Sequence, residues 1–183
     1  MPWYHAVAER EHELQNPTSV EKIRLLGERM RLGPHSRVLD LAAGRGGPAL
    51  VLAQAFGCRI TCVERAPEFA DAARRRLADA DVGELVDVVE ADARDFAIAP
   101  GTYDAALCLG ASFVWDGLEG TLAALSPGVR RGGYVAVGEP YWRRWPLPGA
   151  TDPAGFVALA ETMERLHRAG LRPTSLIASS EDD

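Results

Sequence analysis

The sequence predicts an α/β fold built on a doubly wound, mostly parallel sheet with helices on both faces. Beyond residue 35, short apolar runs rich in Val, Ile, Leu and Cys alternate with longer stretches of helical periodicity. This alternation is typical of parallel strands joined by crossover helices. The chain has 183 residues, 47% of them hydrophobic, which is enough for one sizeable core, so we expect a single domain over residues 1–183.

The apolar runs set the strands that we expect. They lie at 37–41, 59–64, 85–90, 103–109 and 134–139, and a weaker sixth lies at 171–179. A strand that is buried on both faces reads as such a short, continuous apolar run.

The helices are predicted from their end signals. One covers 48–56, and a second begins at Pro67, a residue favoured in the first turn, and runs to about Ala80. A third begins at Asp152-Pro153, reaches His167 and stops at Gly170. Before the first strand, Thr18 and Glu21 form a possible capping box for a helix through Met30. We expect residues 1–35 to form a helical lid and residues 36–183 the core.

Composition excludes several classes of protein. The formal net charge is −6, so no broad basic surface is available for nucleic acid. No apolar run approaches the roughly 20 residues of a membrane span, and the amino terminus lacks the features of a secretory signal. Cys58, Cys62 and Cys108 lie in apolar, strand-like contexts, which fits buried free thiols better than disulfides or metal ligands. A cytoplasmic protein without a bound metal is expected.

A glycine-rich turn follows the first strand. Gly44 and Gly46 allow a ligand to approach the backbone, and the next helix points its amino end at that ligand. With Ala49 they also satisfy the dinucleotide-binding pattern, so an NAD-dependent oxidoreductase is one alternative. Asp40 argues against NAD and for a ligand with a cationic end, because its carboxylate would repel a pyrophosphate and attract an ammonium group.

Two further carboxylates follow the next two strands. Glu64 can accept hydrogen bonds from both hydroxyls of an adenosine ribose, and Asp92 can accept one from an adenine amine. In an open parallel sheet the ligand lies beyond the carboxyl ends of the strands. Asp40, Glu64 and Asp92 at three successive strand ends therefore predict an adenosine ligand with a cationic end.

With these motifs, the segment from Ser36 to Glu139 resembles the class I S-adenosylmethionine-dependent methyltransferases. Within them it is similar to a bacterial group that acts on small molecules, through Gln15-Asn16-Pro17, Cys108-Leu109-Gly110-Ala111-Ser112-Phe113 and Gly138-Glu139-Pro140-Tyr141-Trp142. The resemblance implies a Rossmann-like fold and S-adenosylmethionine as the cofactor. It also implies the cofactor-binding residues Asp40, Ala42, Gly44, Gly46, Glu64, Arg65, Asp92, Ala93, Leu109 and Gly110.

The methyl acceptor is expected to be a small molecule. Phe113, Trp115, Tyr141 and Trp142 would form an aromatic wall near the methyl group. Methyl transfer from a sulfonium needs positioning more than acid–base catalysis, so a general base is optional. Glu139, His12 and His5 are the candidates if one is used.

The sequence departs from the resemblance in two respects. The segment after the fourth strand lacks the Asn/Asp-Pro-Pro-aromatic signature of methyltransferases that act on amino groups of nucleobases or glutamine. The chain also ends before the seventh strand of the usual sheet, so we expect a truncated or differently completed sheet edge. A module that binds the cofactor without turnover is the second alternative.

Overall fold

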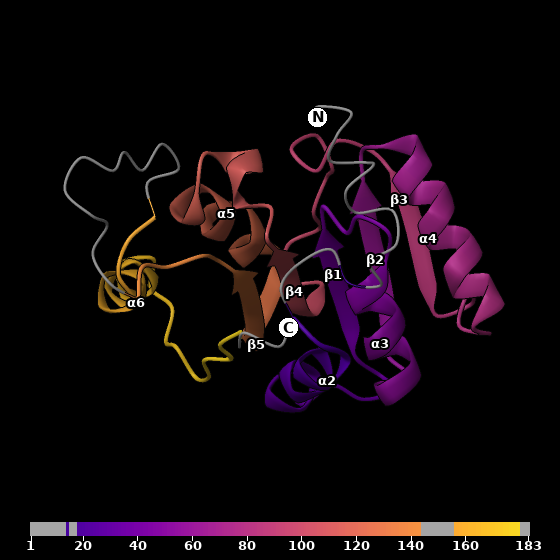
Figure 1. Ribbon diagram of the computed structural model, residues 1–183, viewed down its shortest axis with the longest axis horizontal. Helices are drawn as coiled ribbons and strands as arrows, with labels where there is room; N and C mark the ends of the chain where they lie inside the picture. Colours follow the sequence, from indigo (N-terminus) through magenta and orange to yellow (C-terminus); the bar gives the residue numbers. More distant parts are fainter. Residues whose placement is uncertain (1–13, 15–17, 144–155, 180–183) are drawn as a thin grey trace.

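The protein is described by a computed structural model that covers residue 14 and residues 18–143 and 156–179. Its centre is a five-stranded parallel sheet in the order β3-β2-β1-β4-β5 (Figure 1). The strands are β1 (Arg37–Leu41), β2 (Arg59–Glu64), β3 (Val86–Glu90), β4 (Tyr103–Leu109) and β5 (Val129–Gly138). The order reverses between β1 and β4, which is where open α/β sheets bind their ligands. The predicted fold class is confirmed.

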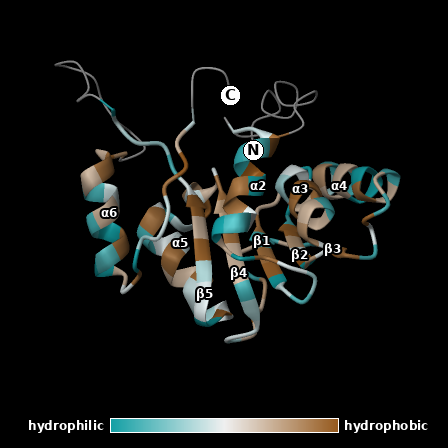
Figure 2. Cartoon of the chain, turned by 90° about the horizontal axis from the view of Figure 1, so that it is seen from below, coloured by the Kyte–Doolittle hydropathy of each residue, from teal (hydrophilic) through white to brown (hydrophobic). Residues whose placement is uncertain are grey.

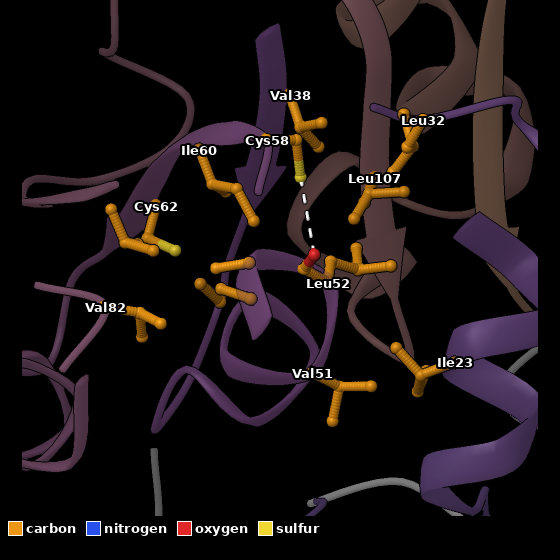
Figure 3. Close-up of a cluster of buried hydrophobic side chains, with 14 of the residues drawn as sticks. Ile23, Leu32, Val38, Val51, Leu52, Cys58, Ile60, Cys62, Val82 and Leu107 are labelled. Atoms are coloured by element: carbon orange, nitrogen blue, oxygen red, sulfur yellow. Dashed lines mark hydrogen bonds between the residues drawn. The ribbon is translucent and has the colours of Figure 1, made fainter. Parts of the chain in front are cut away.

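Three helices cover one face of the sheet. They are α2 (Val20–Arg29), α3 (Gly47–Phe56) and α4 (Pro67–Asp79), which lie in one layer in Figure 2. Their apolar side chains pack on alternate strand residues such as Val38, Ile60 and Leu107. Figure 3 shows this cluster, including Cys58, whose thiol donates to the Leu52 carbonyl oxygen at 3.6 Å. All three cysteines are buried free thiols, as predicted.

The other face is covered by α5 (Leu118–Leu125), by the short 3₁₀ helix η1 (Ser112–Trp115) and by the segment 91–98. A second core cluster forms here, with Leu39, Leu41, Val63, Ala106 and Leu125 among its members. Both faces of β1 and β4 are therefore buried, which explains why these strands read as continuous apolar runs. Neither α5 nor η1 was predicted from the sequence.

The carboxyl-terminal part differs most from the prediction. The helix α6 (Leu159–Arg168) begins at Leu159 and not at Asp152-Pro153. Residues 157 and 158 are extended because Trp142 donates its N–H to the Val157 carbonyl oxygen at 3.0 Å and forms a bridge with Ala158. The predicted sixth strand at 171–179 is wrong, since these residues form neither helix nor strand. Pro173 lacks the backbone donor that a strand requires.

The predicted start of α2 and the predicted start of β5 were also wrong. The N-cap of α2 is Ser19 and not Thr18, because the Ser19 hydroxyl accepts the Lys22 N–H at 3.3 Å. The strand β5 begins at Val129 and not at Tyr134. The lid role of residues 1–35 stays a prediction, because residues 1–13 and 15–17 lie outside the described part. The helix α2 itself packs in the core through Ile23.

Among the described residues, no helix is long and apolar enough to cross a membrane.

The register of β4 against β5 leads to a test at two neighbouring glycines. A Cβ on Gly133 would lie 2.6 Å from the Asp104 carbonyl oxygen, whereas Gly132 has a φ of 76° and open space around it. We expect Gly132→Ala to lower the free energy of unfolding by about 1 kcal/mol through backbone strain alone. Gly133→Ala should cost about 2–3 kcal/mol, because backbone must move.

Urea denaturation followed by circular dichroism measures both values. An equal or smaller loss for Gly133→Ala would contradict the register of these two strands.

Candidate functional site

The carboxyl ends of the strands gather the predicted binding residues along one edge. Asp40 lies on β1, Glu64 ends β2, and Asp92 lies two residues beyond β3. Because β1, β2 and β3 are neighbours in register, these three carboxylates follow one another along the edge. The sequence predicted this juxtaposition, and the sheet order produces it.

The turn after β1 contains three left-handed residues in a short span. Ala42, Gly44 and Gly46 have φ angles of 57°, 57° and 71°. Only glycine adopts this conformation without strain, so Ala42 carries a strain of roughly 1 kcal/mol. A Cβ at Gly46 would also lie 3.1 Å from the Cβ of Ala73 on α4. The turn therefore lies tightly against α4 and leads into the amino end of α3.

Glu64 has a structural role that sequence reasoning missed. One carboxylate oxygen accepts the Gly44 N–H at 2.9 Å, and the other accepts the Ala66 N–H at 2.8 Å. The side chain is 7% exposed. Glu64 thus ties the glycine-rich turn to the turn after β2. A carboxylate has about four acceptor positions, so capacity for ribose hydroxyls remains.

Asp40 is a buried carboxyl group with an unsatisfied oxygen. It is 2% exposed, and its Oδ2 atom has no hydrogen-bond partner among the described residues. Burial, with the nearby Glu64 carboxylate as the second cause, raises the pKa of Asp40 to about 7. A buried, unpaired carboxylate is costly, so a cationic ligand group would stabilise it.

Asp92 lies in a positively charged environment. Arg94 donates to it from its backbone N–H at 3.0 Å and from Nη2 at 2.7 Å, and the Nη1 atom of Arg65 lies 3.6 Å away. The hydrogen bonds from Arg94 hold the pKa of Asp92 well below its usual range. The carboxylate is therefore ionised and retains acceptor capacity. Ala93 beside it is buried.

Leu109 ends β4, and Gly110 follows it next to the end of β5. Gly110 has a φ of 74° and donates its N–H to the Gly138 carbonyl oxygen at 3.0 Å. A Cβ at Gly138 would lie 3.1 Å from the Gly110 nitrogen. Two glycines therefore let the ends of β4 and β5 approach closely.

Glu139 follows directly after β5 and is half-buried. Its Oε1 atom is buried without a partner among the described residues. Burial raises the pKa of Glu139, the side chain of Ser112 opposes that shift, and the Glu119 carboxylate adds to it. Sequence reasoning proposed Glu139 and missed Ser112, whose only signal is its position after Gly110.

The aromatic residues occupy different environments. Phe113 is 66% exposed, whereas Trp115 packs against the second core cluster. Tyr141 and Trp142 are half-buried after β5. Their role as an acceptor wall stays a prediction. His5 and His12 lie outside the described residues.

The opposite edge of the sheet carries a hollow of about 310 Å³ at the amino ends of the strands, with Arg37, Arg59 and Asp87 in its lining. Parallel sheets bind ligands at their carboxyl edge, and the unsatisfied carboxyl groups lie there as well. We therefore take the carboxyl edge as the functional site.

Comparison with known proteins shows the family of the chain. Residues 38–133 match the methyltransferase domain family. The Escherichia coli protein YjhP is 32% identical over 171 residues, which are 93% of this chain and 68% of YjhP.

Two solved structures are similar over nearly the whole chain. A SAM-dependent methyltransferase from Thiobacillus denitrificans, crystallised with S-adenosyl-L-homocysteine, has a TM-score of 0.91 and 28% identity, with 100% of this chain and 76% of that chain covered. Its counterpart from Geobacter sulfurreducens, also with S-adenosyl-L-homocysteine, has a TM-score of 0.85 and 30% identity, with 93% and 71% covered. Nothing in these comparisons supports an oxidoreductase. The chain belongs to the methyltransferase domain family and is a class I S-adenosylmethionine-dependent methyltransferase.

Proposed function

We propose that the protein transfers a methyl group to a small molecule, and that the carboxyl edge of β1, β2 and β3 holds the cofactor. The unsatisfied Oδ2 atom of buried Asp40 carries this proposal. An oxygen that lacks a donor beside a left-handed turn fits the ammonium group at the methionine end of S-adenosylmethionine. The cofactor supplies a methyl group on an activated sulfonium leaving group, so the protein mainly has to bind and orient both reactants.

The remaining binding residues are assigned along the same edge. Ala42, Gly44 and Gly46 surround the methionine part of the cofactor. Glu64 and Arg65 contact the ribose, Asp92 and Ala93 the adenine, and Leu109 and Gly110 lie under the sulfonium. The order of the strands supports these assignments, because it places the residues one after another along the carboxyl edge from β3 to β4.

The acceptor must approach from the β4 and β5 side, because the cofactor occupies the ends of β1 to β3. Phe113, Trp115, Tyr141 and Trp142 follow these two strands, and we assign them to the acceptor pocket. Apolar walls of this kind exclude water from the reacting groups.

Calorimetry with S-adenosylhomocysteine and with NAD tests the cofactor assignment. We expect binding of S-adenosylhomocysteine and none of NAD, because a pyrophosphate would meet the Asp40 and Glu64 carboxylates. Release of S-adenosylhomocysteine during incubation with pools of small-molecule acceptors then tests turnover. Binding without any turnover would favour a non-catalytic module, and binding of NAD alone would reject the proposal.

The ribose contact can be tested at Glu64 with a matched control. Glu64→Gln replaces one acceptor oxygen by an amide donor, so one of the two backbone hydrogen bonds and part of the ribose contact are lost. We expect the affinity for S-adenosylhomocysteine, measured by calorimetry, to fall by about 1.5–3 kcal/mol.

Glu90→Gln makes the same change one strand away, at an exposed residue in register with Glu64. It should change the affinity by less than about 0.5 kcal/mol, as is usual at the surface. Equal losses in the two variants would show that general charge, and not the Glu64 contact, determines the affinity.

The raised pKa of Asp40 predicts a pH-dependent stability without ligand. Because the folded-state value of about 7 lies above the ordinary 3.8, the folded state binds more protons between these values, and stability falls as pH rises. Between about pH 5.5 and 7 the wild-type protein should lose about 2 kcal/mol relative to Asp40→Asn.

Urea denaturation of both proteins at the two pH values gives the difference in the free energy of unfolding. The contributions of all other titrating groups cancel, because the two proteins share them. A difference that stays constant with pH would show that Asp40 ionises normally.

A further inference from the structure

The end of β4 lies between two carboxyl groups. In the sheet, β4 pairs with β1 on one side and with β5 on the other, so Asp40 and Glu139 lie on either side of it. Both carboxylates act on the buried Cys108 thiol of β4. Burial raises the pKa of this thiol to about 12, and the negative charges of Asp40 and Glu139 add to the increase. Asp40 faces the cofactor's methionine end in the proposed function. Glu139 then lies on the acceptor side of the transferred methyl group.

The Glu139 carboxylate can accept a hydrogen bond from a ligand. The side chain of Ser112, which is 9% exposed, acts on this carboxylate and lowers its pKa. The Oε1 atom of Glu139 is buried and has no partner among the described residues. Burial of a carboxylate oxygen without a donor is unfavourable. A ligand that brings an N–H donor would remove this cost.

The charges around this pair disfavour an anionic acceptor. Glu119 on α5 acts on Glu139 as a like charge. The basic side chain nearby on α6, Arg165, forms ion pairs with Glu119 at 3.4 Å and with Glu161 at 3.0 Å. Its positive charge is therefore offset by other carboxylates. A carboxylate or phosphate at the reacting atom would be repelled, whereas an ammonium group would be attracted.

We propose that the methyl acceptor is an amine, and that the Glu139 carboxylate binds its nitrogen as an ammonium group. This inference rests on the proposed function, which sets the methyl group at the end of β4. Phe113, exposed beside Ser112, offers an apolar surface to the carbon part of such an amine.

The proton balance of the reaction fits this role. The ammonium group gives one proton to Glu139 and frees the nitrogen lone pair, which forms the new bond to the methyl carbon. The bond between methyl and sulfur breaks with its electron pair on sulfur. Glu139 then passes the proton to water, so the methylated amine, S-adenosylhomocysteine and one proton are the products.

A pair of cofactor analogues tests the inference without the unidentified acceptor. In sinefungin a carbon atom that bears an amino group replaces the sulfonium centre, so an ammonium group lies where the methyl group is transferred. S-adenosylhomocysteine shares the other contacts and lacks that group. Calorimetry should show that the wild-type protein binds sinefungin at least about tenfold more tightly than S-adenosylhomocysteine, which is the effect of a hydrogen bond between charged groups.

The variants locate the origin of that preference. In Glu139→Gln the two affinities should become equal within about twofold, with the affinity for S-adenosylhomocysteine unchanged, and Ser112→Ala should reduce the preference several-fold. Glu90→Gln, the matched control, removes a carboxylate at the exposed end of β3, on the other side of the sheet from β5, and should leave the preference intact. The wild-type preference should also fall with decreasing pH, as Glu139 becomes protonated in its environment of Ser112, Glu119 and Cys108.

The outcomes separate the two proposals. If neither analogue binds, the proposed function itself fails. If both bind and the preference is absent, or survives Glu139→Gln, or disappears equally in Glu90→Gln, the amine acceptor is rejected while the cofactor site stands. A parallel loss of both affinities in Glu139→Gln would also reject it, because the residue would then act on the cofactor and not on the acceptor.

Discussion

The two hydrogen bonds that Glu64 accepts organise the site. The Gly44 and Ala66 N–H groups belong to turns after different strands, and a single carboxylate satisfies both. These bonds fix the glycine-rich turn against the end of β2, so the amino end of α3 and the edge of the sheet have a defined separation before any ligand binds. A site that is organised in advance loses less entropy on binding. The same carboxylate also contributes to the raised pKa of Asp40.

The carboxyl groups of the edge lie in contrasting environments. Asp92 is surrounded by arginines and remains ionised, and Glu64 is satisfied by backbone donors. Within the described part of the chain, Asp40 and Glu139 each keep a buried oxygen without a partner. Desolvation and partner charges explain these differences. The carboxylates whose oxygens accept hydrogen bonds from the protein define the shape of the site. The carboxylates with an unpaired buried oxygen mark where a cationic ligand group would gain most binding free energy. This division follows from the fold, because each residue stands at the end of a different strand.

Much of this architecture follows from the sequence. The bounds of β1, β2 and β4 agree with the prediction because apolar residues dominate each of these segments. The start of β5 did not, because its pairing with β4 is irregular there: Val129 pairs with Tyr103 and Tyr134 with Ala105, and residues 130–133 lie between these two pairs. The helix α5 is short and contains Gly120, which weakens its periodic signal. At the site, the residue types at the strand ends were enough to identify the carboxylates. The effect of Ser112 on Glu139 and the two hydrogen bonds that Glu64 accepts depend on three-dimensional distances, which a sequence pattern does not contain.

The close approach of Gly110 and Gly138 has an evolutionary consequence. Backbone atoms alone set the spacing between the ends of β4 and β5, so the side chains at positions 112 and 139 can change without altering that spacing. The residues proposed to bind the cofactor, by contrast, are coupled to one another through the turn and Glu64. New acceptor preferences can thus arise by one or two substitutions on the β5 side, whereas a substitution in the proposed cofactor half disturbs several contacts at once. The fold divides one edge into an interdependent part and an adaptable part.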